Sequence, residues 1–406
     1  MINLDLILPE RSKNKSEMKV LWLASIYPSK LFSYDGDFIQ RHARATALYC
    51  QIEVLHIIKD ENGSLTKDVK EIINTDGNLT ERIIYYKPVK TSIKILDRLL
   101  SSLKYKQLSR AAVKKYIADN GKPHFFHLHV AMKAGLTALW AKRKYNIPYL
   151  LTEHWGGYLD EAVPNISDYN FVYQNYWRKI ITGAMASSFV SAYLQQFMVK
   201  KYGIQNTQII SNVVNTAIFY PVEKPSADKI RFIHISTMVY QKNPEAILNA
   251  LSMLKDEFEF EMFIYGPATA MQMQFVTILG LEEKVFFKGE VPQEELARSM
   301  QQCDALILYS RFETFGCVLI EANACGIPVI VSDLEVFHEI VEEGVNGFFA
   351  VGESSDALAV KLREFVKQRN HFNKNLIAIN ASEKYNYKKI GQQFIELYNN
   401  VEVNLP

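Results

Sequence analysis

The sequence predicts an α/β protein built from two parallel-sheet domains. The first reason is size, because 406 residues, of which 48% are hydrophobic, are enough for two cores. The second is order: short apolar runs alternate with helical segments along the chain, as they do in parallel sheets. The third is the concentration of polar turn residues and prolines at 211–225, which divides this alternation into two series.

The domain boundaries follow from these patterns. Residues 1–17 are expected to be a leader, and they contain neither a signal-peptide apolar region nor a membrane-spanning run. We expect the first domain at 18–215 and the second at 216–383. A final helix, 384–406, is expected to pack back on the first domain.

Each element is predicted from the period of its apolar residues. In the first domain, strands are expected at 19–25, 51–58, 82–86, 124–129, 147–152, 187–191 and 208–210. Helices are expected at 38–49, within 87–115, beginning near Gly135, at 173–185 and at 192–202. In the second domain, strands are expected at 230–236, 258–265, 285–287, 305–309, 329–331 and 348–349, and helices at 244–254, 293–302, 316–325, 336–343, 354–368 and 387–399. The polar segment 59–71 has no predicted element.

The stretch 304–332 carries the strongest signal for a binding site. Its apolar run predicts a buried strand that ends in a loop with Arg311 and Glu313, and Gly316 then opens a helix. The first N–H groups and the positive dipole end of such a helix bind anions. A rise of roughly 8–12 Å separates Glu313 from Glu321 if the segment is regular. An elongated ligand with hydroxyl groups at both ends and negative charge in the middle, such as a nucleotide-diphosphate-sugar, fits this layout.

A second glycine, Gly36, precedes the first helix of the chain. It could let backbone amides approach a phosphate or a sugar closely, although an ordinary strand-to-helix loop accounts for it equally well. Asp35, Gly36 and Asp37 form a D-x-D triplet, which holds a divalent metal in some glycosyltransferases. A three-residue pattern is weak, so we predict no metal site from it.

Histidines gather at two neighbouring strand ends. His127 and His129 point to one face of their strand, which a metal could use, but no third ligand is evident nearby in the sequence. A structural role accounts for one of the pair, and His129, at the carboxyl end, is the better candidate for a contact in an active site. The segment 153–157 is charged, aromatic and glycine-rich, and its His154 is a candidate for an acceptor or phosphate loop.

The segment 87–115 is strongly basic. Leucines and isoleucines interrupt the basic residues at helical spacing, and Asp97 is the single acidic residue. The pattern predicts one or two basic amphipathic helices, which either cover the domain or dock on an anionic bilayer. The basic residues are Lys87, Lys90, Lys94, Arg98, Lys104, Lys106, Arg110, Lys114 and Lys115.

Charge and cysteine content exclude other classes of protein. The formal net charge of +2 does not indicate nucleic-acid binding. The four cysteines show no spacing typical of metal ligands, and a reducing cytoplasm suits them best.

These residues resemble the family 4 retaining glycosyltransferases of the GT-B fold, in which two Rossmann-like domains face a cleft. The resemblance extends from about Met18 almost to the end of the chain. It is most specific in the second half, where the E-x7-E signature is matched by Ser310, Glu313, Gly316, Glu321, Ala322, Gly326, Pro328 and Val329, with Gly289 and the Asn346-Gly347 turn nearby. Looser matches in the first half are Gly36, the H-x-H strand end, the Thr152-Glu153-His154 strand end and Asn212.

The resemblance implies a role for each matched position. Glu313 would bind the hydroxyls of the donor sugar, and Glu321 would bind the ribose. Lys242 would neutralise the departing diphosphate in place of a metal, and His129 would lie beside the transferred sugar. The N–H groups of the helix start, Phe315, Gly316, Cys317 and Val318, would receive the sugar and the distal phosphate.

The implied enzyme moves a sugar, with retention, from a nucleotide-diphosphate-sugar to a glycan or a lipid-linked acceptor, as in the biosynthesis of cell-surface polysaccharides. No cofactor and no metal are expected. The expected location is the cytoplasm, with peripheral binding of the inner membrane face through 87–115.

Two positions depart from the family pattern. Thr237 stands where the family usually has an arginine five residues before the phosphate lysine, and Arg311 is a candidate substitute. The glycine pair expected after 329–331 is replaced by Glu335 and Val336.

Three other functions are compared with the glycosyltransferase prediction. A sugar-nucleotide 2-epimerase has the same architecture. A dinucleotide-dependent oxidoreductase is disfavoured, because neither half has a G-x-G-x-x-G loop after its first strand. A non-enzymatic membrane-associated scaffold would use 87–115 and bind no nucleotide.

Overall fold

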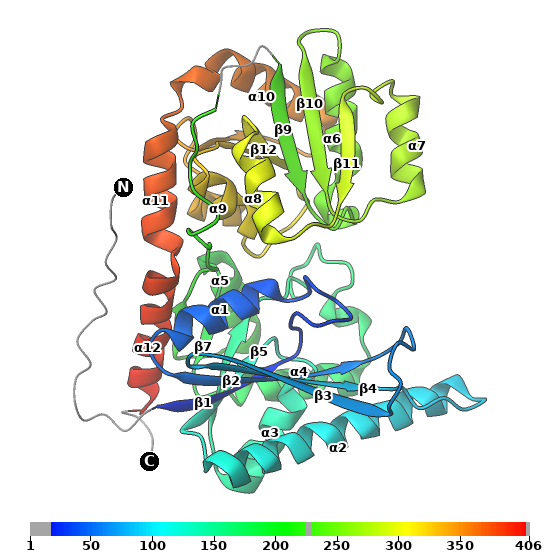
Figure 1. The fold of residues 1–406 in the computed structure, drawn as a ribbon, viewed down its shortest axis with the longest axis vertical. Helices are drawn as coiled ribbons and strands as arrows, with labels where there is room; N and C mark the ends of the chain where they lie inside the picture. The colour runs from blue at the N-terminus through cyan, green and yellow to red at the C-terminus, as the bar shows by residue number, and fades with distance from the viewer. Residues whose placement is uncertain (1–17, 225–228, 403–406) are drawn as a thin grey trace.

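The computed structural model describes residues 18–224 and 229–402, which form two α/β lobes stacked one on the other (Figure 1). The expected leader, 1–17, lies outside the described residues. Within the described ranges, no helix is long and apolar enough to cross a membrane. Two sheets of parallel strands confirm the predicted α/β class.

The first lobe is built on an eight-stranded sheet in the order β3-β4-β2-β1-β5-β6-β7-β8, which is parallel except for β3 against β4. The strands are β1 (Lys19–Ala24), β2 (Gln51–Lys59), β3 (Val69–Asp76), β4 (Leu79–Tyr86), β5 (Phe125–His129), β6 (Tyr149–Glu153), β7 (Ser187–Phe189) and β8 (Thr207–Ile209). The helices are α1 (Asp37–Ala47), α2 (Lys94–Asn120), α3 (Gly135–Tyr145), α4 (Phe171–Thr182) and α5 (Ala192–Tyr202).

The second lobe is built on a six-stranded parallel sheet in the order β11-β10-β9-β12-β13-β14. The strands are β9 (Ile230–Ile235), β10 (Phe260–Tyr265), β11 (Val285–Gly289), β12 (Ala305–Leu308), β13 (Val329–Ser332) and β14 (Gly347–Ala350). The helices are α6 (Pro244–Leu254), α7 (Ala270–Ile278), α8 (Gln293–Gln301), α9 (Cys317–Ala324), α10 (Ser355–Gln368), α11 (Lys374–Tyr385) and α12 (Tyr387–Glu402).

Both sheets reverse their strand order beside their first strand. In the first lobe β1 lies between β2 and β5, and in the second β9 lies between β10 and β12. Central strands such as β12 are buried along their whole length, because helices cover both faces of the sheet. Ligands of open parallel sheets bind at the carboxyl ends of the strands beside such a reversal, so each lobe offers one half of a site there.

The last helix, α12, returns to the first lobe. Helices α11 and α12 run along one side of both lobes in Figure 1. Trp22 Nε1 of β1 donates to the hydroxyl of Tyr398 at 3.1 Å, and the same hydroxyl lies 2.7 Å from Nδ1 of His127. Gly391 allows the close approach, since a Cβ there would lie 2.2 Å from the carbonyl oxygen of Ala45 in α1.

The structure contains elements that the sequence did not predict. Residues 69–71 were assigned to a polar segment without structure, but they begin β3, which is largely exposed and pairs antiparallel with β4 at the edge of the sheet. Helices α7 and α11 were also missed. The predicted helix at 336–343 is instead a short 3-10 helix, Glu335–Glu339. An exposed edge strand needs no apolar face, so the hydrophobic period that reveals the other strands is absent there.

Candidate active site

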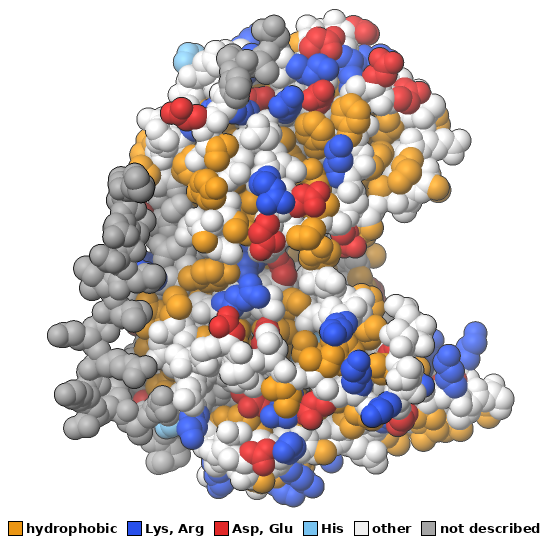
Figure 2. Space-filling view, in the orientation of Figure 1, with side chains coloured by type: hydrophobic (Ala, Val, Ile, Leu, Met, Phe, Trp, Pro, Cys, Tyr) orange, Lys and Arg blue, Asp and Glu red, His pale blue; other side chains and the backbone are white. Residues whose placement is uncertain are grey.

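A cavity lies between the lobes, where the carboxyl edges of the two sheets meet. The first lobe contributes side chains from α1 and from the segments after β6 and β7, and the second lobe contributes the loops after β9, β10, β11 and β12. The space-filling view shows the molecule hollowed between the two lobes (Figure 2). Among the residues that the structure describes, the basic side chains lining the cavity are Arg41 and Lys242.

An ion pair lies at the end of β12 in the second lobe. Lys242 Nζ contacts Glu313 Oε1, and both side chains are mostly buried. Ser310 Oγ donates to the same carboxylate oxygen at 2.9 Å, and Gln241 Nε2 donates to Oε2 at 3.3 Å. The loops after β9 and β12 therefore hold one carboxylate with three donors, so its orientation in the cavity is fixed.

The start of α9 forms another part of the wall. Gly316, at the N-cap, has φ of +97°, a conformation that side chains disfavour. A Cβ there would also lie 3.1 Å from Leu319 and Phe337. The neighbouring Phe315, Cys317 and Val318 line the cavity with it. The free N–H groups and positive dipole end of α9 thus belong to the cavity wall, which favours an anionic guest.

Glu321, one turn further along α9, is paired with a cation of the other lobe. Arg41 Nη1 of α1 donates to Glu321 Oε1 at 2.6 Å and to the carbonyl of Val213 at 3.0 Å. Its Nη2 lies 3.1 Å from Asp37 Oδ2. Burial raises the pKa of the Glu321 carboxyl, and the charge of Arg41 opposes this rise. Burial alone would lower the pKa of Arg41, but Asp37 and Glu321 outweigh it and raise that pKa.

Further hydrogen bonds join the lobes around the cavity. The N–H groups of Ala192 and Tyr193, at the start of α5, each donate to the carboxylate of Glu339 at 2.8 Å. Thr314 Oγ1, in the loop before α9, donates to the carbonyl of His154 at 3.0 Å. The two halves of the cavity are therefore held together by direct contacts.

The histidines are arranged differently from the expectation. His127 is structural, since its ring nitrogens lie 2.7 Å from Tyr398 and from Thr152 Oγ1. His129, which was placed beside the transferred sugar, is fully buried, stacks on Trp22 at 3.9 Å and does not line the cavity. His154 lines the cavity instead.

Three other candidates have distinct positions. Thr237 lines the cavity. Arg311, the candidate substitute for the missing arginine, does not line it, because its guanidinium lies 4.2 Å from the ring of Tyr240 and donates to that residue's carbonyl. Gly36 caps α1 with φ of +69°, and the next residue, Asp37, reaches the cavity.

Sequence reasoning missed Arg41, the second cation of the site. Its signal was an arginine within the buried stripe of α1, between Ile39 and Ala43, which are both fully buried. Charged residues are rarely buried without a partner, so an arginine at such a position predicts a carboxylate in contact with it. The sequence could not name that partner, because Glu321 lies 280 residues away.

The paired parallel sheets and the cavity between their carboxyl edges define a GT-B fold. HepE from Anabaena, solved in complex with UDP and glucose, superposes with a TM-score of 0.70 at 18% identity, covering 95% of this chain and 100% of that one. A likeness at this identity shows the fold.

Two family models place the chain more closely. Residues 219–384 match the glycosyl transferases group 1 and residues 73–218 match glycosyltransferase family 4, without a break between them. The chain therefore belongs to the glycosyltransferases that these two models describe.

Two curated relatives show the extent of the sequence similarity. The N-acetyl-alpha-D-glucosaminyl L-malate synthase of Bacillus anthracis is 27% identical over 173 residues, which are 42% of this chain and 45% of that protein's length. The N,N'-diacetylbacillosaminyl-diphospho-undecaprenol alpha-1,3-N-acetylgalactosaminyltransferase of Campylobacter jejuni is 25% identical over 292 residues, which are 66% of this chain and 74% of that protein.

Proposed function

We propose that the protein is a retaining, metal-independent glycosyltransferase that uses a nucleotide-diphosphate-sugar and modifies a glycan or lipid-linked acceptor. The observation that carries the proposal is the Lys242 and Glu313 pair beside the N-terminus of α9, in a cavity shared by both lobes. This arrangement places a carboxylate, a cation and a set of N–H donors together, as the hydroxyls and phosphates of such a donor require.

Lys242 acts on the leaving group. When the bond between the anomeric carbon and the diphosphate oxygen breaks, negative charge grows on the diphosphate and positive charge grows on the sugar ring. The ammonium of Lys242 and the N–H groups at the start of α9 stabilise the first charge. Glu313 binds the sugar hydroxyls. When the donor binds, the ammonium of Lys242 leaves its ion pair with Glu313 and contacts the phosphate instead.

Glu321 binds the ribose hydroxyls at the other end of the donor. Arg41 donates a hydrogen bond to the Glu321 carboxylate in this structure, so the ribose hydroxyls and Arg41 compete for Glu321. Arg41 is then turned toward the diphosphate and supplies the charge that Thr237 lacks. The loop that carries His154 lines the first lobe's side of the cavity and contacts the sugar or the acceptor.

The test is a donor screen with UDP-, GDP- and ADP-sugars, followed by product analysis by NMR. UDP-sugars are tested first, because the structure of HepE, whose fold the chain shares, was solved with UDP. Lys242→Ala should lower kcat by roughly 10²–10³-fold, the cost of losing one donor to a developing anion, and Mg²⁺ should not restore it. Glu313→Gln should lose transfer while nucleotide binding persists.

Lys229→Ala is the matched control. Lys229 forms a surface ion pair with Glu261 in the same lobe, and its loss should leave the rate unchanged. Full activity in Lys242→Ala would overturn the site assignment. A sugar-nucleotide 2-epimerase would convert the donor without any acceptor, and inversion at the anomeric carbon would refute retention.

The basic segment suggests where the acceptor lies. Helix α2 carries an exposed apolar stripe near its N-terminal end, which projects from the first lobe (Figures 1 and 2). Lys90, Lys94 and Arg98 are exposed beside this stripe. Apolar residues flanked by cations fit an anionic bilayer surface, and we place the enzyme there as a peripheral protein of the cytoplasmic face. The stripe consists of Ile93, which immediately precedes the helix, and of Ile95, Leu96, Leu99 and Leu103.

Sedimentation with anionic phospholipid vesicles tests this location. Reversing Lys90, Lys94 and Arg98 to Glu should release the protein, because each cation near the surface contributes about 1 kcal/mol. Lys104 and Arg110 are unsuitable for this test, because Lys104 pairs with Asp68 and Arg110 lies over Trp140. The matched control reverses three exposed lysines elsewhere, Lys367, Lys388 and Lys389. Equal loss of binding in both variants would contradict a specific surface.

A further inference from the structure

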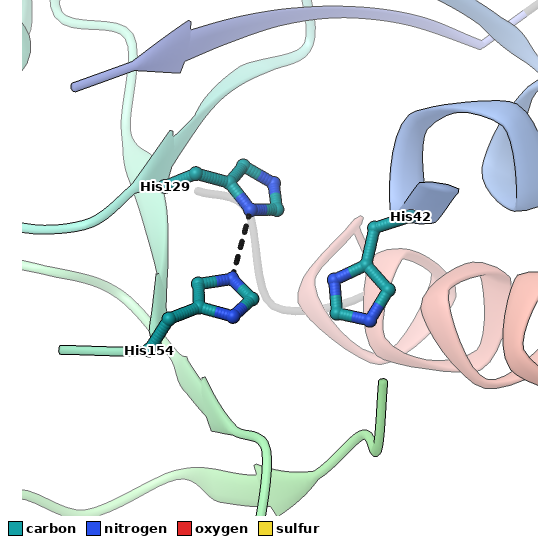
Figure 3. Close-up of side chains that lie close together, drawn as sticks. All are labelled: His42, His129 and His154. Atoms are coloured by element: carbon teal, nitrogen blue, oxygen red, sulfur yellow. Dashed lines mark hydrogen bonds between the residues drawn. The ribbon is translucent and has the colours of Figure 1, made fainter. Parts of the chain in front are cut away.

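Three histidines from separate elements of the first lobe converge beside the cavity. His42 lies on α1, His129 ends β5 and His154 follows β6. One ring nitrogen from each lies within 4.8 Å of the other two. Figure 3 shows the three rings turned toward a common space. All three side chains are buried, with His154 the most exposed at 7%.

These rings carry an unusual share of unpaired polar atoms. Within 18–224 and 229–402, seven buried side-chain nitrogen or oxygen atoms have no hydrogen-bond partner, and three of them are His42 Nδ1, His129 Nε2 and His154 Nδ1. The contact between His129 Nδ1 and His154 Nε2, at 3.5 Å, is too long for a strong hydrogen bond. Nε2 of His129 and Nδ1 of His154 are the ring nitrogens outside this contact, so the site itself is formed by the unpaired His42 Nδ1 and by the loosely paired His129 Nδ1 and His154 Nε2. Buried polar atoms are normally well paired, so these three nitrogens indicate a ligand.

The spacing suits a tetrahedral ion. Imidazole nitrogens lie about 2.0–2.1 Å from zinc, so two of them on one tetrahedral ion are about 3.3–3.4 Å apart. The nitrogens of His129 and His154 are already 3.5 Å apart. The nitrogen of His42, within 4.8 Å, needs to move by at most about 1.5 Å to complete the set.

We propose that His42, His129 and His154 form a binding site for a divalent transition metal ion, and that Zn²⁺ is the preferred ion. The ion fastens α1 to the ends of β5 and β6. The proposal concerns the first lobe alone and does not depend on the proposed transfer reaction.

The surroundings of the rings favour this ion. Nε2 of His42 lies 3.0 Å from the carbonyl of Ser211, which fixes the ring and leaves Nδ1 as the electron-pair donor. The neighbouring charge of Arg41 is balanced by Asp37 and Glu321. The cavity gives the ion a way in, because His154 lines it.

Calorimetric titration of untagged, chelator-treated protein with Zn²⁺ tests the site. We expect one ion per chain, and no binding of Mg²⁺ at this site, because Mg²⁺ prefers oxygen ligands. His42→Gln should weaken Zn²⁺ binding by at least 10–100-fold, which is the loss typical of an outer-shell partner. His56→Gln is the matched control: His56 is also buried, with one ring nitrogen 3.0 Å from a carbonyl and the other unpaired.

Two spectroscopic measurements distinguish metal bound by the three histidines from metal bound elsewhere on the protein. Cobalt should give the visible absorption of a four-coordinate Co²⁺ ion in the wild type and in His56→Gln, but not in His42→Gln. X-ray absorption of the zinc-loaded wild type, which needs no variant to fold, should show three imidazoles at about 2.0–2.1 Å. Unchanged zinc affinity in His42→Gln, no binding by the wild type, or zinc without imidazole ligands would each overturn the proposal.

Discussion

The buried ion pair between Arg41 and Glu321 makes a testable contribution to stability. Their side chains are each 4% exposed, so removal of one partner leaves the other charge buried and unpaired. Such a loss costs about 3–5 kcal/mol. At about 2–4 °C per kcal/mol for a domain of this size, Arg41→Met should lower the melting temperature of the first unfolding step by roughly 6–20 °C.

The same pair predicts how this deficit changes with pH. Without Arg41, nothing offsets the burial that raises the pKa of Glu321. A carboxyl whose folded pKa lies above its unfolded pKa costs stability once the pH exceeds the unfolded value, and the cost grows until the folded pKa is passed. The deficit of Arg41→Met should therefore be larger at pH 8 than at pH 5.

Thermal melts of the wild type, Arg41→Met, a double variant and a surface control test this contribution to stability. The double variant Arg41→Met with Glu321→Gln carries no buried charge at this pair and should be more stable at pH 8 than Arg41→Met alone. Arg363→Met is the surface control, because the Arg363 and Glu257 pair is 38% and 41% exposed and should contribute little. A shift below about 2 °C in Arg41→Met, or a double variant no more stable than the single one, would refute the reasoning.

Three further outcomes are expected. Tyr398→Phe removes the hydroxyl shared by Trp22 and His127, so about 1–3 kcal/mol of stability should be lost in thermal melts; an unchanged melt would contradict the role of this contact. Gly36→Ala adds a methyl group 2.9 Å from the backbone after β1 at a φ of +69°, and should lower the yield of folded protein in circular dichroism. Gly63→Ala has a similar φ of +72° but open space around it, so it should cost less and isolates the effect of the close contact. Burial raises the pKa of the Cys317 thiol to about 12, so alkylation followed by mass spectrometry at pH 8 should be slow in the native state and fast in urea.

The sequence predicted those parts of the site whose residues lie close together in the chain. Glu313, Gly316 and the helix after them form one local pattern, and the end of a parallel strand fixes where that pattern lies. Lys242 follows the strand next to it in the sheet, so the same rule brings it to the cavity. The α/β class and most strands were predictable for a related reason, because buried parallel strands are continuous apolar runs.

The rest depends on contacts between distant residues. Nothing near His129 in the sequence shows that Trp22 stacks on it and that His154, rather than His129, lines the cavity. The reach of Arg311 was equally hidden, because the position of Tyr240, 71 residues earlier, decides it. Strand β3 was missed because its exposed edge position allows a polar sequence.

The return of α12 to the first lobe has a consequence for folding during synthesis. The hydroxyl of Tyr398 contacts Trp22 across 376 residues of chain, so the first lobe stays incomplete until the ribosome has added residue 398. The sheet of the second lobe lies entirely within the intervening residues. The lobe that is synthesised first is thus the last to be finished, and until then it exposes an apolar face along α1 and β1 that chaperones can bind.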